Sequence, residues 1–262
     1  MATVNLQPPI RPEAAPPQHD DFSLARRTFS VLSIATAAAL LVANIFRLSC
    51  APGVFQWWLL PIIVAGMAAA DFLSGLIHWS ADTWGSESML FIGRRLLHPF
   101  RVHHVNPDDF LRRRFIDTNG DVAFLAIPIL IAMLLLPLQG TPHIAAAVFM
   151  VAFCAIGLLT NQVHQWAHMP DPPGLVRVLQ DWEIILSRGA HRQHHAPPYA
   201  ANYCIATGWC NRPLSAIDFF RRLEHTVTFI TGLRPRDDDE AFQAKIDTLP
   251  VPHWEKAGGR HV

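Results

Sequence analysis

The amino-acid sequence predicts an all-α integral membrane protein with about four transmembrane helices. Hydrophobic residues make up 51% of the 262 residues and charged residues only 16%, against roughly 25% charged residues in an ordinary soluble domain. The mean hydropathy is positive, at +0.21, and long stretches of the chain carry no charge. This composition excludes a disordered chain. It also favours a membrane protein over the alternative, a soluble bundle of unusually apolar helices.

The chain begins with a segment of a different character. Residues 1–27 contain five prolines among the first 20 residues and few large apolar side chains, which predicts a disordered tail. The first charge-free apolar run follows at residues 28–46. A second covers residues 48–70, and its apolar character persists to Trp79. These two runs are the first two predicted spans.

The third and fourth spans are predicted in one long uncharged stretch. From residue 122 to residue 170 the sequence has no Asp, Glu, Lys or Arg. A Gly/Pro turn signal at residues 138–143 divides it, so residues 122–137 and 144–163 are expected to form a transmembrane hairpin. Because a bilayer core needs about 20 helical residues, the first of these halves is expected to extend into its flanking residues.

The basic residues predict the orientation. Three of the 21 Lys and Arg residues precede residue 28, six lie in the 80–121 loop, and eleven follow residue 170. Only Arg47 lies near the opposite ends of the spans. The positive-inside rule therefore predicts that both termini, including a C-terminal tail at residues 237–262, are cytoplasmic. The net charge is zero, and we expect no nucleic-acid partner.

Fourteen histidines are many for a chain of this length, and eight of them fall in four groups on the predicted cytoplasmic side. These eight are His78, His103, His104, His164, His168, His191, His194 and His195. Helical residues three or four apart share a face, so the HxxxH and HxxHH spacings each aim imidazoles in one direction. Six other histidines have simpler explanations in tails, a turn or charged surface, although His98 is ambiguous: His19, His98, His143, His225, His253 and His261.

The eight histidines together indicate a metal site. A single histidine at a helix end is usually an interfacial side chain, but adjacent imidazoles repel one another when protonated and favour a metal. Imidazole binds Zn, Cu, Fe and Ni alike. Eight ligands are too many for one tetrahedral zinc and suit two ions better. No thiolate accompanies them, which argues against an iron–sulfur cluster. Two Fe ions that activate O2 are the interpretation that we favour.

Polar residues near the histidines are candidates to support them. The second span carries a polar stripe that runs from Asp71 through His78 to Asp82. A carboxylate such as Asp71 in a membrane segment is costly and usually has a partner. We expect it to orient a metal-bound imidazole through the second ring nitrogen. The residues assigned to this supporting role are Asp71, Asp82, Asn161 and Asp218.

Eight motifs occur in order along the chain. They are DFLSGLIHWSADTWGS (71–86), PFRVHHVNP (99–107), FIDTNGD (115–121), NQVHQWAH (161–168), LQDWEIIL (179–186), HRQHH (191–195), YCIATGW (203–209) and FFRRLE (219–224). Together they resemble the Kua/CarF family of lipid desaturases, over residues 71–236. Members of this family convert the 1-O-alkyl chain of an ether phospholipid into the vinyl ether of a plasmalogen.

The resemblance implies a membrane-embedded lipid desaturase domain at residues 28–236, with two Fe ions and O2 as co-substrate. The eight characteristic histidines of the family map onto the eight residues selected above, and His98 falls outside the family pattern. Glu183 and Ala190 stand where some relatives carry a histidine, so the resemblance implies no metal role for them.

Two other functions remain open at this stage. A related branch desaturates a phospholipid acyl chain near its carboxyl end and shares the histidine pattern, but FIDTNGD is more similar to the branch that acts on plasmanylethanolamine. A non-catalytic protein that binds or transports a metal is the second alternative. No GxGxxG loop or haem-attachment motif is visible, so we expect a separate electron donor of the cytochrome b5 or ferredoxin type. The cluster Arg112-Arg113-Arg114 could dock that donor or a lipid phosphate, or simply anchor the membrane face.

Overall fold

The computed structural model describes residues 23–233 apart from residues 55, 87, 197 and 198. All the regular structure in this part of the chain is helical. Residues 1–22 of the predicted N-terminal tail at residues 1–27, and the whole predicted C-terminal tail at residues 237–262, lie outside the described residues. The all-α class predicted from composition is confirmed.

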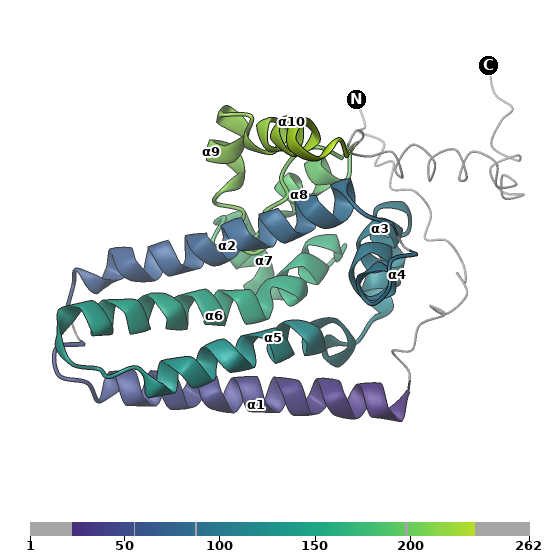
Figure 1. Cartoon of the computed structure of the whole chain (residues 1–262). Coiled ribbons are helices and arrows are strands. Elements are labelled where there is room, and N and C mark those ends of the chain that lie inside the picture. The colour runs from purple at the N-terminus through teal and green to yellow at the C-terminus, as the bar shows by residue number, and fades with distance from the viewer. Residues whose placement is uncertain (1–22, 55, 87, 197–198, 234–262) are drawn as a thin grey trace, which may run out of the picture.

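Four long helices lie side by side (Figure 1). They are α1 (Leu24–Ser49), α2 (Leu59–Thr83), α5 (Phe115–Leu135) and α6 (Gly140–His168). Each is long and apolar enough to cross a membrane, and only 22–33% of their most apolar windows is buried inside the protein. A soluble bundle would cover such extensive apolar surface. The exposed faces therefore agree with four helices in a bilayer.

The ends of the long helices differ from the apolar runs that mark them in the sequence. α1 and α6 extend beyond their runs at both ends, whereas α2 begins only at Leu59, inside its predicted run at residues 48–70. Ser23 caps α1, because its Oγ accepts a hydrogen bond from the backbone N–H of Arg26 at 3.1 Å. The helix thus starts four residues before residue 28, inside the predicted tail. α5 starts at Phe115, seven residues before the predicted limit at residue 122. Hydropathy identifies the apolar centre of a span, whereas its polar end turns are fixed by caps and ion pairs such as Arg26–Asp121, at 2.9 Å.

The long helices of the bundle pack against each other in pairs. α1 packs against α5, α2 against α6, and α5 against α6. Gly66 allows the close approach of α2 to α6, since a Cβ at that position would lie 2.4 Å from the Phe149 carbonyl oxygen. Between α1 and α5, the Asn44 side chain donates a hydrogen bond to the Leu130 carbonyl at 3.0 Å. The close approach at Gly66 brings together the two helices that carry His78, His164 and His168.

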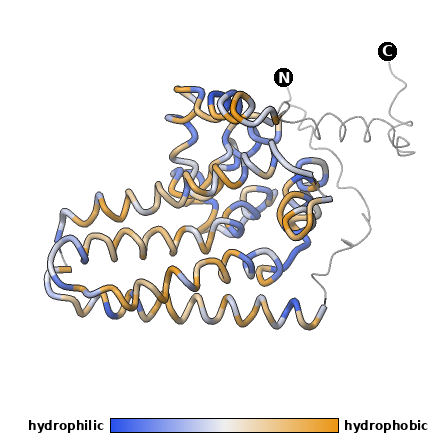
Figure 2. The backbone as a smooth tube through the Cα atoms, in the orientation of Figure 1, coloured by the Kyte–Doolittle hydropathy of each residue, from blue (hydrophilic) through white to orange (hydrophobic). Residues whose placement is uncertain are grey.

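In the described part of the chain, seven short helices gather at one end of the bundle and beside α2 (Figure 1). They are η2 (Gly93–Leu97, a π-helix), α3 (His98–Val105), α4 (Pro107–Arg112), α7 (Gly174–Asp181), α8 (Arg188–His194), α9 (Asn211–Ala216) and α10 (Phe219–Thr231). Figure 2 shows the most hydrophilic segments concentrated in this region and apolar residues along the long helices. The start of α1 and the ends of α2 and α6 lie at this end too. The two long polar segments, between α2 and α5 and after α6, therefore lie at the same end of the bundle.

Candidate metal centre

The eight histidines selected from the sequence converge where α2, α3, α6 and α8 meet. His78 comes from the last turns of α2, and His164 and His168 come from the end of α6. α3 and α8 contribute the remaining five, the last of them at the C-cap of α8: His103, His104, His191, His194 and His195. Five of the eight are no more than 4% exposed, and the other three are half-buried.

The imidazoles form two adjoining groups. One contains His78, His103, His104 and His194, and the other contains His103, His164, His168 and His195. Within each group, one ligand atom of every residue lies within 4.8 Å of those of the others. His103 belongs to both groups. His191 adjoins the second one, because its Nε2 lies 2.7 Å from Nε2 of His168.

Two backbone carbonyls orient the first group. Nδ1 of His78 lies 3.1 Å from the Tyr203 carbonyl oxygen, and Nδ1 of His194 lies 2.7 Å from that of Ala201. A carbonyl oxygen only accepts, so both Nδ1 atoms carry the proton. Nε2 of each ring is then left with a free lone pair that faces the cluster. Sequence reasoning missed these two partners, because a backbone carbonyl has no residue-type signal.

The ring nitrogens fit a cation. Seven of the eight imidazoles have a buried ring nitrogen without a hydrogen-bond partner in the described part of the chain. These atoms are His78 Nε2, His103 Nε2, His104 Nδ1, His164 Nε2, His191 Nδ1, His194 Nε2 and His195 Nε2. A buried polar atom is nearly always satisfied in a native protein. Most of these nitrogens face one another, and a metal ion would satisfy them together.

Burial also keeps the imidazoles neutral. It lowers the pKa of four histidines that lie outside the membrane-spanning helices below their ordinary value of 6.5, and neighbouring imidazoles lower it further: His103, His191, His194 and His195. For His194, the nearby Asp82 carboxylate and a backbone carbonyl act in the opposite direction. A neutral imidazole is the form that binds a metal. The electrostatics of the cluster therefore suit metal ligation near neutral pH.

The sequence predicts that Asp82 supports the imidazoles from behind. In the structure, its carboxylate lies among the imidazoles of the first group. Its Oδ2 is 3.0 Å from Nε2 of His104, 3.3 Å from Nε2 of His78 and 3.5 Å from Nε2 of His194. The Nδ1 atoms of His78 and His194 are already occupied by carbonyls. The carboxylate thus meets the nitrogens that face the cluster. A carboxylate oxygen and two imidazole lone pairs repel one another unless a cation or a proton lies among them.

Asp71 has a different role from the one expected. Its carboxylate accepts four backbone N–H groups and contacts no imidazole among the described hydrogen bonds. The donors, at 2.8–3.2 Å, are Ala206, Thr207, Gly208 and Cys210. The orientation of His78 that we expected from Asp71 is supplied instead by the Tyr203 carbonyl. Asp71 fixes the loop that carries this carbonyl.

The other two supporting candidates also lie away from the imidazoles. The Asn161 side chain donates to the Thr118 carbonyl at 2.6 Å and joins α6 to α5. Asp218 is exposed at the start of α10, where it adopts a left-handed backbone conformation (φ 55°) and its side chain makes no capping hydrogen bond. Sequence proximity to a motif did not predict their contacts.

Six histidines lie outside the cluster or outside the described residues, and three of them belong to the second kind: His19, His253 and His261. His98 and His143 belong to neither metal group, and His143 lies in the first turn of α6, at the opposite end. His225 is exposed on α10. Glu224, to which the motif alone assigns no role, is buried and accepts hydrogen bonds from Trp79 Nε1 at 3.2 Å and from Arg221 at 2.6 Å. It ties α10 to α2.

Comparisons with known proteins agree with this geometry. The lipid desaturase domain matches residues 67–238. The plasmanylethanolamine desaturase of Myxococcus xanthus is 39% identical over 244 residues, which cover 93% of this chain and 87% of that protein. Plasmanylethanolamine desaturase 1 of Mus musculus is 43% identical over 190 residues, 70% of each chain.

A plant relative is more distant. Fatty acid desaturase 4-like 1, chloroplastic, of Arabidopsis thaliana is 34% identical over 191 residues, which cover 70% of this chain and 62% of that protein. No solved structure matches the chain. The domain match extends over well more than half of the chain and includes all eight converging histidines. This chain belongs to the lipid desaturase family.

Proposed function

We propose that this protein is a plasmanylethanolamine desaturase, which converts the 1-O-alkyl chain of an ether phospholipid into a vinyl ether. The observation that carries this proposal is the pair of buried imidazole groups that share His103 at one end of the transmembrane helices. The 39% and 43% identity to two desaturases of that name supports the substrate. An acyl-lipid desaturase is the second candidate, favoured by the 34% identity to plant relatives named as fatty acid desaturases.

The residues divide between two proposed metal ions. His78, His104 and His194, with the Asp82 carboxylate, would hold one ion. A second ion would be held by the imidazoles at the end of α6 and on α8: His164, His168, His191 and His195. His103 lies between the two groups. We assign iron to both positions, because an all-nitrogen and carboxylate set suits a redox-active ion that must activate O2.

The reaction removes two hydrogens from C1 and C2 of the alkyl chain. When bound, iron supplies the redox chemistry that no side chain can, since these C–H bonds are barely acidic. Overall, the alkyl ether, O2, two electrons and two protons give the vinyl ether and two waters. The two electrons come from a separate carrier of the cytochrome b5 or ferredoxin type, for which the Arg112-Arg113-Arg114 segment is the proposed docking site.

The chain itself positions the ligands and excludes water. The Tyr203 and Ala201 carbonyls hold two imidazole rings in one tautomer and orientation. Aromatic rings cover the cluster: Phe100 lies edge-on to His78 at 5.0 Å between ring centroids, and Phe110 lies 5.0 Å from His164. A protected site at the membrane boundary limits side reactions of a strong oxidant. The lysine and arginine distribution supports a cytoplasmic location for it.

Lipid analysis tests the proposed reaction. Expressed in a cell that makes alkyl-ether phosphatidylethanolamine but no vinyl ethers, the protein should form acid-labile plasmalogen, and His194→Ala should form none. Lipid mass spectrometry before and after mild acid treatment measures the product. An acid-stable unsaturated acyl lipid, with no acid-labile product from a supplied alkyl-ether lipid, would instead identify an acyl desaturase.

A further inference from the structure

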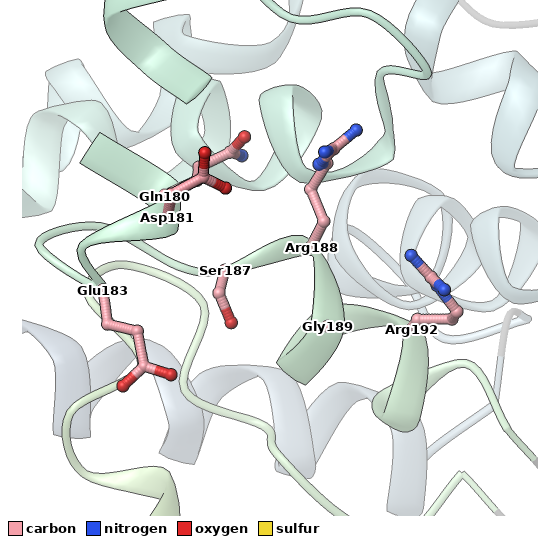
Figure 3. Close-up of a pocket in the computed structure, with 7 residues that line it drawn as sticks. All are labelled: Gln180, Asp181, Glu183, Ser187, Arg188, Gly189 and Arg192. Carbon is pink, nitrogen blue, oxygen red and sulfur yellow. The ribbon is translucent and has the colours of Figure 1, made fainter. Parts of the chain in front are cut away.

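A polar cavity next to α8 has no part in the metal centre. It has a volume of about 300 Å³ and lies between the C-terminal part of α7 and α8 (Figure 3). This volume is at the lower end of the range of small-ligand sites. The polar side chains that line it are Gln180, Asp181, Glu183, Ser187, Arg188 and Arg192.

The side-chain amide of Gln180, which lines the cavity, lacks hydrogen-bond partners among the described residues. The residue is only 1% exposed, yet neither Oε1 nor Nε2 of its side chain has a hydrogen-bond partner among the residues that the structure describes. Leaving both ends of a buried amide unsatisfied is unfavourable. A ligand in the cavity would supply the missing partners.

The charges of the lining residues suit a zwitterion. Arg188 and Arg192 are four residues apart on α8 and share one face, and Figure 3 shows them on one wall with Gln180 and Asp181 on the other. Glu183 already pairs with Arg212 outside the cavity, at 3.1 Å. Arg188 donates one hydrogen bond to the Pro170 carbonyl at 3.2 Å and keeps further N–H groups. Together with Arg192 it matches a phosphate. The Asp181 carboxylate matches an ammonium group.

α7 places the cavity at the membrane surface. Its exposed apolar residues, Leu175, Val178 and Trp182, are spaced i, i+3 and i+7, and they are 72%, 43% and 73% exposed. They share one face, whereas Gln180 projects from the opposite one. A short helix with an exposed apolar face and a terminal tryptophan is typical of the lipid interface. A lipid headgroup is therefore the expected source of the phosphate.

The metal centre lies within reach of such a headgroup. α8 carries both arginines and two of the clustered histidines, His191 and His194. His191 follows Arg188 by three residues, so these two side chains are neighbours on one helix face, with Cβ atoms about 5–6 Å apart. Six bonds separate the phosphorus of an ether phospholipid from the first alkyl carbon, which spans at most about 9 Å at about 1.5 Å per bond. A headgroup bound beside α8 can thus leave C1 near the imidazoles.

We propose that this cavity binds the phosphoethanolamine headgroup of the substrate, an inference that rests on the proposed function. The phosphate lies against Arg188 and Arg192 and takes a hydrogen bond from the Gln180 amide, and the ammonium group lies against Asp181. The cavity then determines which headgroup is accepted and sets the depth of the alkyl chain.

Lipid retention tests the cavity without turnover. Native mass spectrometry of the full-length protein, transferred from nanodiscs that contain alkyl-ether phosphatidylethanolamine, counts the bound lipid. Arg192→Gln should weaken retention about tenfold, as expected for the loss of a charge-assisted contact. Arg177→Gln is the matched control, because Arg177 pairs with the exposed Asp171 outside the cavity. Wild-type retention by Arg192→Gln would overturn the proposal.

Two further arms identify the ligand. Asp181→Asn should abolish the preference for phosphatidylethanolamine over phosphatidic acid, and an unchanged preference would refute the ammonium site. Glycerophosphoethanolamine should displace the lipid at concentrations where inorganic phosphate does not; displacement by both alike would indicate a free-phosphate site and overturn the headgroup assignment. Because retention requires no catalysis, a protein that retains the lipid but forms no vinyl ether refutes the proposed function and not the cavity.

Discussion

Asp82 shows how one residue can decide the chemistry of the cluster. Its Oδ2 meets Nε2 of His78, His104 and His194 at 3.0–3.5 Å. The carboxylate is only 6% exposed, so water does not compensate its charge. Backbone carbonyls hold the protons of His78 and His194 on the far side of each ring. Several acceptors therefore converge on one point, where a cation stabilises all of them.

The Asp82→Asn variant should lose metal at this position. The amide keeps the size of the side chain but removes its negative charge, so metal affinity should fall by at least the roughly 10–100-fold that loss of a supporting partner costs. Metal content after dialysis against a chelator, measured by elemental mass spectrometry, checks this. Asp218→Asn, at an exposed carboxylate, is the control and should match wild type. Equal metal retention in both variants would rule out Asp82 as a ligand.

At the residue scale, the sequence predicts which side chains converge far better than it predicts the groups that orient them. The HxxxH and HxxHH spacings aim imidazoles in one direction, and all eight histidines converge as expected. The carbonyls of Tyr203 and Ala201 could not be predicted, because any residue type provides one. The cost of burying Asp71 correctly indicated a partner, but four backbone amides from a distant segment satisfy it.

At the scale of elements, the loop between α8 and α9 is bound to α2 by several hydrogen bonds. Asp71 and Ser74 bind its backbone, and Gly75 lets it approach, since a Cβ there would lie 2.4 Å from the Cys204 Sγ. The same loop presents the Tyr203 carbonyl to His78, one turn further along α2. Asp71 and Ser74 at the start of the polar stripe therefore hold the loop in place, and the loop in turn orients the His78 imidazole further along the same helix.

Asp71→Asn should loosen this loop. An amide group turns one acceptor into a donor that faces a backbone N–H, and losing even one charge-assisted hydrogen bond costs about 1.5–3 kcal/mol. We expect a lower melting temperature and faster hydrogen exchange at the amides of residues 206–210. Asp171→Asn removes only an exposed pair and should leave both unchanged. Wild-type exchange rates in Asp71→Asn would show that the loop is held by other contacts.

The boundaries of the elements were predicted less well than their existence. Four apolar runs correctly give four long helices, but they leave the polar first turn of α1 in a tail and the polar first two turns of α5 in a loop. Arg26 and Asp121 lie in these turns and bond to each other. An ion pair between two helix ends cannot be inferred from either apolar run alone. The helix ends thus depend on contacts that form only in the folded bundle.

At the scale of the whole molecule, the two ends of the helix bundle differ in the length of the connections between the long helices. The links between α1 and α2 and between α5 and α6 are short, at residues 50–58 and 136–139, whereas everything that surrounds the histidines lies at the other end. Arg47 is the exception among the basic residues, and its guanidinium is taken up by the Met133 carbonyl at 2.9 Å. Because the last carbonyls of α5 accept its hydrogen bonds, the guanidinium complements the negative end of that helix dipole, which accounts for a basic residue on this face.

Cysteine labelling tests the orientation that follows. Cys50 is exposed at the end of α1, on the face away from the histidines, so a membrane-impermeant maleimide should label it in intact bacterial spheroplasts. Cys50→Ser should remove that label. In this background, Asp171→Cys places a thiol on the histidine face at a position that is 86% exposed, and it should react only after permeabilisation. Labelling of Asp171→Cys in intact spheroplasts would put the metal centre on the outer face, where a cytoplasmic electron donor could not reach it.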